Sequence, residues 1–153
     1  MILNILIVIL TFFFMEFMAW FTHKFVMHGF LWNLHYDHHN KEKGFFEKND
    51  TFFLIFAIPS SILIITGITY NFDFKLWIGI GILLYGISYF LVHEVLIHRR
   101  FPKLRKILFK KQNNKYLKVL QYAHKMHHSH LNKEDGESFG MLIVNKKYYK
   151  KVK

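Results

Sequence analysis

Ten of the eleven histidines follow a pattern that occurs twice along the chain. Each copy reads H-x4-H and then H-x2-H-H. The two copies together contain His23, His28, His35, His38, His39, His93, His98, His124, His127 and His128. Neutral imidazoles bind iron, zinc, copper or nickel, and ten of them are enough to hold two ions. The pattern therefore predicts a site for two metal ions, and the spacing leaves the element open.

The two spacings place imidazoles differently on a helix. Residues three and four apart share a helix face, so each H-x2-H-H run can chelate a metal from one side. Residues five apart lie about 140° apart on a regular helix, which is too far for one metal. Either a π-bulge or a helix end brings each H-x4-H pair together, or its two rings serve different metals. Gly29 after His28 and Pro102 after His98 favour a helix end.

His130 lies outside the pattern, and we expect it not to be a ligand. Metal-bound imidazoles usually donate their second N–H to an acceptor. Four carboxylates lie close to the pattern in sequence: Asp37, Glu94, Asp135 and Glu137. Glu94 is the favoured acceptor, because it lies at the end of an apolar run, where a solvated role is least available. We expect no catalytic residue beyond the metal ligands.

Composition restricts the kind of protein that can carry this site. The chain contains no cysteine, so any metal must be held by nitrogen or oxygen. Its net charge of +11 could indicate nucleic-acid binding, but 52% of the residues are hydrophobic and many lie in runs of about 20. Runs of this length are typical of membrane helices. We therefore expect a membrane protein and no nucleic-acid partner.

Three apolar runs are long enough to cross a bilayer of about 30 Å: residues 1–21, 51–70 and 74–97. Only three residues separate the second run from the third, which predicts a tight antiparallel hairpin. The sequence thus predicts a single all-α domain over residues 1–153. It would be an integral-membrane helical bundle with about three transmembrane helices, and four is the alternative. An alternative is that some of these helices are re-entrant or interfacial.

The basic residues predict the orientation of this bundle. None precedes Lys24, four lie in residues 24–50, one is Lys75, and sixteen lie in residues 98–153. Twenty of the 21 therefore fall on one side, which the positive-inside rule assigns to the cytoplasm. We expect a bacterial inner-membrane protein with its N-terminus outside and its C-terminus inside. Every histidine of the pattern then belongs to a cytoplasmic cap that holds two metals.

Glu16 is the one acidic residue of the first run. It precedes His23 by seven residues, which places it near the same helix face and about 10 Å higher. We expect it to face the interior and to line a cavity above the metals. The alternative is a polar residue that packs in the bundle without a role in the chemistry.

The strings that carry the pattern resemble those of a known family. They are HKFVMHGFLWNLHYDHH, HEVLIHRRFP, and AHKMHH followed by SFGMLIV. In order, spacing and flanking residues they are similar to the membrane oxygenases of the fatty-acid hydroxylase and sterol desaturase type, and among these to the β-carotene 3-hydroxylases. The resemblance extends from about residue 23 to residue 144.

This resemblance implies a chemistry for the metals. It implies two non-haem iron ions, O2 as co-substrate, and two electrons per hydroxylation from a ferredoxin-like or other donor. The reaction would hydroxylate the β-ionone rings of a carotenoid taken from the bilayer, converting β-carotene to zeaxanthin through cryptoxanthin. Residues 103–118 contain more lysine than expected for the family. They could bind an acidic electron carrier or anionic lipid headgroups.

The sequence is also compatible with two alternative functions. A hydroxylase or desaturase of the same type could act on a fatty-acyl or sterol substrate. A non-catalytic membrane protein that transports or stores metal would show the same histidines. A transporter is disfavoured because residues 52–70 and 76–92 contain no ionisable side chain apart from tyrosine, whereas ion pathways usually do.

Overall fold

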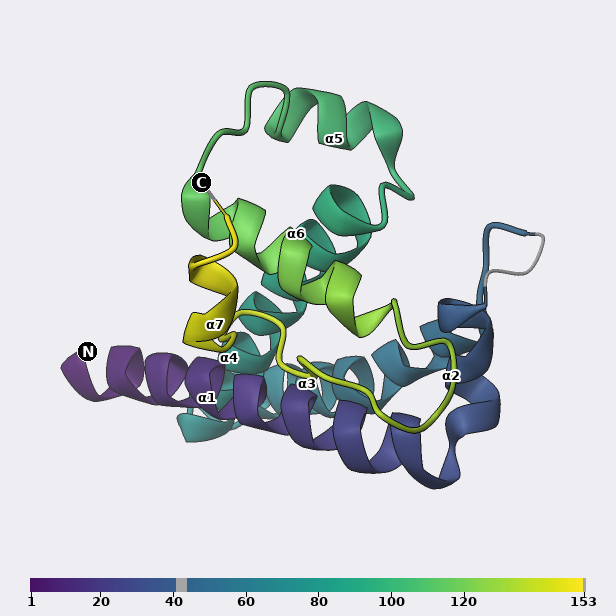
Figure 1. Cartoon of the computed structure of the whole chain (residues 1–153). Helices are drawn as coiled ribbons and strands as arrows, with labels where there is room; N and C mark the ends of the chain where they lie inside the picture. The colour runs from purple at the N-terminus through teal and green to yellow at the C-terminus, as the bar shows by residue number, and fades with distance from the viewer. Residues whose placement is uncertain (41–43, 153) are drawn as a thin grey trace.

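A computed structural model describes residues 1–40 and 44–152 of the chain, and all regular structure in these two ranges is helical (Figure 1). Three of the lysines that predicted the orientation, Lys41, Lys43 and Lys153, lie outside the described residues. The expectation of an all-α protein is confirmed for the described part of the chain.

Within the described ranges the chain forms seven α-helices: α1 (Ile2–Phe21), α2 (Trp32–His39), α3 (Thr51–Thr69), α4 (Phe74–Tyr89), α5 (Pro102–Leu108), α6 (Lys115–His127) and α7 (Lys146–Tyr149). Two further segments are π-helical. The first π segment, Thr22–Phe30, continues α1, and the second π segment, Phe90–Ile97, continues α4. A short 3-10 turn, Lys48–Asp50, leads into α3.

Three helical stretches are long and apolar enough to span a membrane: Ile2–Phe30, Lys48–Thr69 and Phe74–Ile97. This confirms the expected membrane bundle of three helices. The first stretch is longer than predicted, because the helix does not stop at Phe21 but passes into the first π segment. Asn71 and Phe72 adopt left-handed backbone conformations (φ 56° and 59°) and form the tight turn of the predicted hairpin.

Helix α4 packs closely against both α1 and α3 through glycines. A Cβ atom on Gly81 would lie 2.6 Å from Cβ of Thr11 in α1, and one on Gly79 would lie 2.7 Å from Ile64 in α3. Side chains of any size would push the helices apart at these points. Small residues at helix contacts are typical of membrane bundles, where close backbone approach replaces the hydrophobic effect. The Ser60 hydroxyl adds a hydrogen bond of 2.8 Å to the Gly79 carbonyl.

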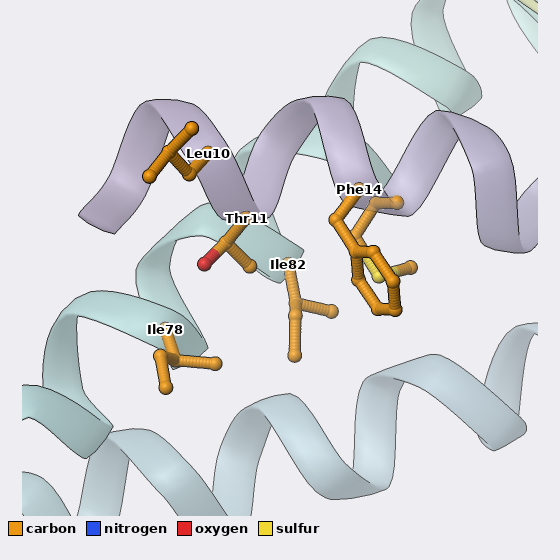
Figure 2. A pocket seen from close by; sticks show the side chains of 6 residues that line it. Leu10, Thr11, Phe14, Ile78 and Ile82 are labelled. Atoms are coloured by element: carbon orange, nitrogen blue, oxygen red, sulfur yellow. The ribbon is translucent and has the colours of Figure 1, made fainter. Parts of the chain in front are cut away.

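A small apolar groove of about 370 Å³ lies between α1 and α4 (Figure 2). It is lined by Leu10, Thr11, Phe14, Met15, Ile78 and Ile82. No histidine lines this groove, so it is separate from the predicted metal site.

The remaining elements form a cap around the histidines. Val119 and Ala123 of α6 pack against Tyr148 of α7, and all three side chains are buried. After α6 the chain extends towards α2 and then returns past α1 to reach α7 (Figure 1). This returning segment brings residues 128–145 against the histidines of the first π segment and of α2.

Candidate metal centre

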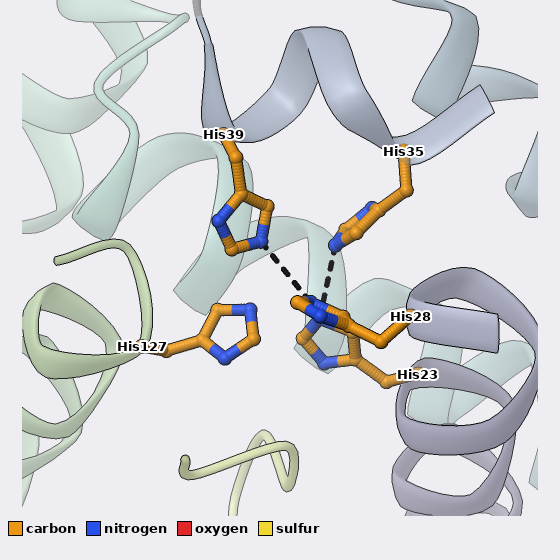
Figure 3. A group of neighbouring side chains, drawn as sticks. All are labelled: His23, His28, His35, His39 and His127. Atoms are coloured by element: carbon orange, nitrogen blue, oxygen red, sulfur yellow. Dashed lines mark hydrogen bonds between the residues drawn. The ribbon is translucent and has the colours of Figure 1, made fainter. Parts of the chain in front are cut away.

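Five histidines from three elements converge on one point, and we call them the first histidine group. They are His23 and His28 of the first π segment, His35 and His39 of α2, and His127 of α6 (Figure 3). Each offers a ring nitrogen that lies within 4.8 Å of the corresponding atom of every other member. All except the half-buried His23 are buried.

A second histidine group lies beside the first. It comprises His38 of α2, His93 and His98 at the second π segment, and His124 of α6, with ligand nitrogens again within 4.8 Å of one another. The ring of His128 is 4.5 Å from that of His124 and 4.9 Å from that of His98. The structure therefore brings together all ten histidines of the sequence pattern.

The π-helical turns are what place residues five apart on one side. The His98 N–H donates to the His93 carbonyl at 2.9 Å, and Leu31 donates to Val26 at 3.0 Å, each five residues back. This wider turn brings the two rings of each H-x4-H pair close, at 4.4 Å between the centroids of His93 and His98. Both segments also end close to these turns, because Gly29 leaves the helical conformation (φ −103°, ψ −123°) and His98 is the C-cap of the second π segment. The structure therefore combines the π-helical turn with the helix end that Gly29 and Pro102 favoured.

Helices α2 and α6 each divide their histidines between the two groups, which the shared-face interpretation did not anticipate. On α2, His35 and His39 belong to the first group and His38 to the second. On α6, His124 belongs to the second group and His127 to the first. In an α-helix, residues i and i+4 are about 40° apart, whereas i+3 is turned about 60° to the other side of i. Each helix lies between the groups and serves both.

The nitrogens of the first group face one another as ligands of one ion would. The Nε2 atoms of His23 and His35 are 3.2 Å apart, as are those of His28 and His39. All four rings direct Nδ1 to an oxygen acceptor, so their Nε2 atoms present lone pairs to each other. Ligands about 2.1 Å from one metal are separated by about 3 Å, which matches these distances.

The second group has a similarly short distance between ring nitrogens. The Nε2 atoms of His98 and His124 are 2.8 Å apart. The buried Nε2 atoms of His127 in the first group and His128 beside the second have no hydrogen-bond partner among the described residues. A buried nitrogen without a partner is costly unless a cation binds it. The two groups therefore fit two metal ions.

Main-chain carbonyls orient four rings of the first group. All four belong to the segment that returns after α6. His39 donates to the carbonyl of His130 at 2.9 Å, His28 to Lys133 at 3.1 Å, His127 to Glu137 at 2.9 Å and His23 to Phe139 at 3.0 Å. His130 thus contributes its backbone, not its imidazole, to the first group.

Side chains near the start of α3 orient further rings, and the histidine spacing alone does not single out these side chains. His35 donates to Asn49 Oδ1 at 2.6 Å, and His38 donates to the Glu47 carboxylate at 2.8 Å. Both acceptors lie in the polar stretch before the second span, which is the one sequence signal that could have indicated them. Asp37, which the sequence suggested, accepts instead the backbone N–H of Lys48 at 2.6 Å.

Glu94 accepts the Nδ1–H of His93 at 2.6 Å, as the sequence suggested. Its other oxygen pairs with Arg100 at 2.8 Å, and Arg100 also pairs with Asp50 at 2.7 Å. Arg100 lies close to His98, and it connects the end of the second π segment to the start of α3. Glu137 pairs with Lys147 and Tyr148, so its carboxylate orients no histidine of either group.

Burial keeps the histidines outside the spans neutral, which is the state that binds metal. Burial lowers the pKa of His35 to about 2, that of His39 to about 4 and that of His127 to about 3. It also lowers the pKa of His38 and His124 well below the ordinary value, and neighbouring imidazoles add to the effect. Burial raises the pKa of Glu47, although the Arg100 charge opposes this.

Glu16 faces the interior, as expected, but its carboxylate is bound to the returning segment. One oxygen accepts the N–H groups of Met141, Leu142 and Ile143 at 3.0, 2.9 and 2.8 Å. The other accepts the Tyr85 hydroxyl at 2.7 Å. A large cavity lies beside the histidines. Glu16 itself does not line this cavity, whereas its partners Tyr85 and Met141 do.

That cavity has a volume of about 850 Å³ and lies among α1, α3 and α4. His23, His93 and His124 line one part of it, and most of the rest is apolar. A Cβ atom on Gly86, which also lines the cavity, would meet nothing within 4 Å. A large apolar space with a few polar groups at one point is the usual form of a binding site for an apolar small molecule.

Comparison with known proteins gives a consistent result. The sequence profile described as "Fatty acid hydroxylase" matches residues 8–145. A β-carotene hydroxylase from Pantoea ananas is 45% identical over 92% of this chain and 77% of its own length. Another from Pseudescherichia vulneris is 41% identical over 95% of this chain and 80% of its own.

A plant relative matches over a smaller share of its own length. The chloroplastic β-carotene 3-hydroxylase 2 of Arabidopsis thaliana is 33% identical over 84% of this chain and 41% of the plant protein. No solved structure matches the chain. The matched region and the bacterial relatives show that the chain belongs to the fatty acid hydroxylase family, and that within this family it is similar to β-carotene hydroxylases.

Proposed function

We propose that the chain is a non-haem di-iron monooxygenase that hydroxylates the β-ionone rings of carotenoids, converting β-carotene to zeaxanthin through cryptoxanthin. The observation that carries the proposal is the apolar cavity, because it places a space for an apolar ring directly against His23, His93 and His124. The similarity to named β-carotene hydroxylases supports the substrate class.

The five members of the first histidine group would hold one iron. The four members of the second would hold the other, with His128 as a fifth ligand, since its buried Nε2 has no other partner among the described residues. Sets made only of imidazoles are compatible with iron. When bound, such ions would supply the oxidising chemistry needed to break an unactivated C–H bond, which no amino-acid side chain provides.

The protein's own residues position the ring and keep water away. The cavity wall includes Phe52, Phe56 and Ile64, which offer no hydrogen bond to water. Phe53 of α3 and Ile87 of α4 line the cavity and are also 65% and 46% exposed. The cavity therefore reaches the face that lipid would cover, and a carotenoid would enter sideways from the bilayer between α3 and α4.

The distribution of the basic residues along the sequence supports an orientation of the chain in the membrane. We propose that the chain lies in a bacterial inner membrane with its N-terminus outside and the histidines on the cytoplasmic side, where an electron donor such as a ferredoxin can reach them. Each hydroxylation would consume one O2 and two electrons.

Product analysis in cells that make β-carotene tests the proposal. Expression of the chain should yield cryptoxanthin and zeaxanthin, and the purified protein should contain two irons per chain. Hydroxylated or desaturated fatty acids or sterols without zeaxanthin would favour the alternative substrate class. Metal binding without any oxygen consumption would contradict an enzymatic function.

A further inference from the structure

The two histidine groups differ in the charge of the atoms that receive their outward N–H groups. All five rings of the first group donate to uncharged oxygens, namely four main-chain carbonyls and the Asn49 side chain. In the second group, His38 donates to the carboxylate of Glu47 at 2.8 Å and His93 to that of Glu94 at 2.6 Å. The groups are therefore built from the same ligand type but have different surroundings.

The negative charge beside the second group is only partly cancelled. Arg100 pairs with both Glu94 and Asp50, so its single positive charge is divided between two carboxylates. Among the described residues, Glu47 forms no salt bridge with a lysine or arginine, and its partner His38 is a neutral imidazole. Glu47 is also poorly exposed, at 14% for the side chain, so water screens its charge weakly.

A carboxylate acceptor increases the basicity of the imidazole that donates to it, because it draws the Nδ1 proton outward. The opposite nitrogen, Nε2, then gives more electron density to a metal. A carbonyl or an amide oxygen has the same effect to a smaller degree. An ion in the second group would thus be held by stronger donors and would lie in a more negative field, and both factors stabilise a higher oxidation state.

We propose that the two irons are electronically inequivalent, and that Glu47 and Glu94 give the iron of the second group the lower reduction potential. This inference rests on the proposed function, because it requires one iron in each group. Glu47 and Glu94 are positioning and charge-setting residues here, since neither is a ligand. The second group also provides two cavity-lining histidines, His93 and His124, whereas the first provides His23 alone. The iron that is oxidised more easily is therefore the one beside the substrate space.

The test measures the two irons separately in the ⁵⁷Fe-loaded full-length protein. Mössbauer spectra should resolve two doublets, and a redox titration should resolve two midpoint potentials. In Glu47→Gln and Glu94→Gln, the lower potential should rise and one doublet should change while the other keeps its parameters. Hydroxylation should fall by roughly 10- to 100-fold, the usual effect of removing such a partner.

Two further variants provide matched controls. Glu134→Gln removes an exposed carboxylate from the same returning segment, away from the rings of both groups, so both potentials should stay at wild-type values. Asn49→Asp gives His35 of the first group a charged acceptor, so the higher potential should fall and the other doublet should change.

Each outcome decides between the hypotheses. Fully loaded glutamate variants with unchanged potentials, or with both potentials shifted equally, would overturn the inequivalence. If a glutamate variant retains only one iron, the Asn49→Asp variant tests the proposal instead. An unchanged higher midpoint potential in Asn49→Asp would overturn the proposal. A wild-type protein with fewer than two irons per chain would instead contradict the di-iron assignment itself, which is a distinguishable failure.

Discussion

The Glu16 carboxylate, inside the first membrane-spanning helix, holds the backbone N–H of Met141 at 3.0 Å, although the two residues are 125 positions apart in the chain. Three consecutive N–H groups share this one acceptor. The same segment provides the Phe139 carbonyl that orients His23 and the Gly140 and Met141 lining of the cavity. Glu16 therefore connects the membrane bundle to both the metal centre and the substrate space.

Replacing Glu16 by leucine should release this segment. Three N–H groups lose their acceptor, and the buried N–H of Met141 alone costs about 1–3 kcal/mol if it stays without a partner. We expect lower thermal stability, lower iron content and loss of hydroxylation. Glu16→Gln is the matched control, because its amide oxygen can still accept the three N–H groups, and it should keep most of its iron. Full activity and full iron content in Glu16→Leu would show that the carboxylate only fills space in the bundle.

Filling the cavity at Gly86 should block the substrate without disturbing the metals. A phenylalanine side chain there would extend into open space beside the histidines. We expect Gly86→Phe to reduce zeaxanthin formation by about 100-fold or more, because a displaced ring no longer meets the metal centre. Iron content should stay at two per chain. Leu84→Phe, on the exposed side of the same helix, is the control and should keep its activity. Unchanged product formation in Gly86→Phe would mean that the ring binds elsewhere.

Alanine substitutions should separate the two histidine groups by metal content. We expect His39→Ala and His127→Ala to deplete the iron of the first group, and His38→Ala and His124→Ala to deplete that of the second. Each of the ten substitutions should abolish hydroxylation. His130→Ala should retain most activity, since only its backbone contacts the site. Wild-type zeaxanthin formation in His39→Ala or His128→Ala at equal expression would contradict the di-iron assignment.

Acidification should destabilise the metal-free protein. In the unfolded chain the histidines bind protons near pH 6.5, whereas in the folded chain the pKa values of His39 and His127 are about 4 and about 3. Between these limits the unfolded state binds more protons, so stability falls as the pH falls from about 6.5. One unit of difference on one histidine corresponds to about 1.4 kcal/mol.

Thermal melts of the metal-free protein in detergent between pH 7.5 and 5 measure this effect. Burial raises the pKa of the Glu47 carboxylate from 4.5, which acts in the opposite direction, so the same melts on Glu47→Gln remove that contribution. The slope of melting temperature against pH should be shallower in His39→Gln. A melting temperature that stays constant or rises on acidification would show that these imidazoles are not kept neutral by the fold.

The sequence was sufficient to predict the three spans and the convergence of the histidines, because long apolar runs and a repeated spacing are local signals. It also limited the H-x4-H pairs to a few geometries, of which the π-helical one occurs. It could not predict that His38 and His127 join the group opposite to their helical neighbours, since that depends on where α2 and α6 lie relative to the two groups.

The acceptors of the histidine N–H groups were the least predictable part. Four are main-chain carbonyls in residues 130–139, and a carbonyl has no sequence signature. Glu47 and Asn49 precede a membrane span by a few residues, where polar side chains are common for reasons unrelated to metals. Glu94 could be anticipated only because it directly follows His93 at the end of an apolar run.

His38 lies in the first half of the chain but belongs to the second group, and His127 lies in the second half but belongs to the first group. Neither group is therefore complete until both halves have folded. Each half of the chain contains one incomplete coordination set and one histidine that belongs to the other set. A nascent chain that has inserted only α1 and α2 therefore cannot retain an ion with its full complement of ligands. Two bound ions would cross-link residues 23–39 to residues 93–128 and would close long loops in the unfolded chain. Metal capture would then be a late event that reports complete folding, and loss of either ion would loosen both halves together.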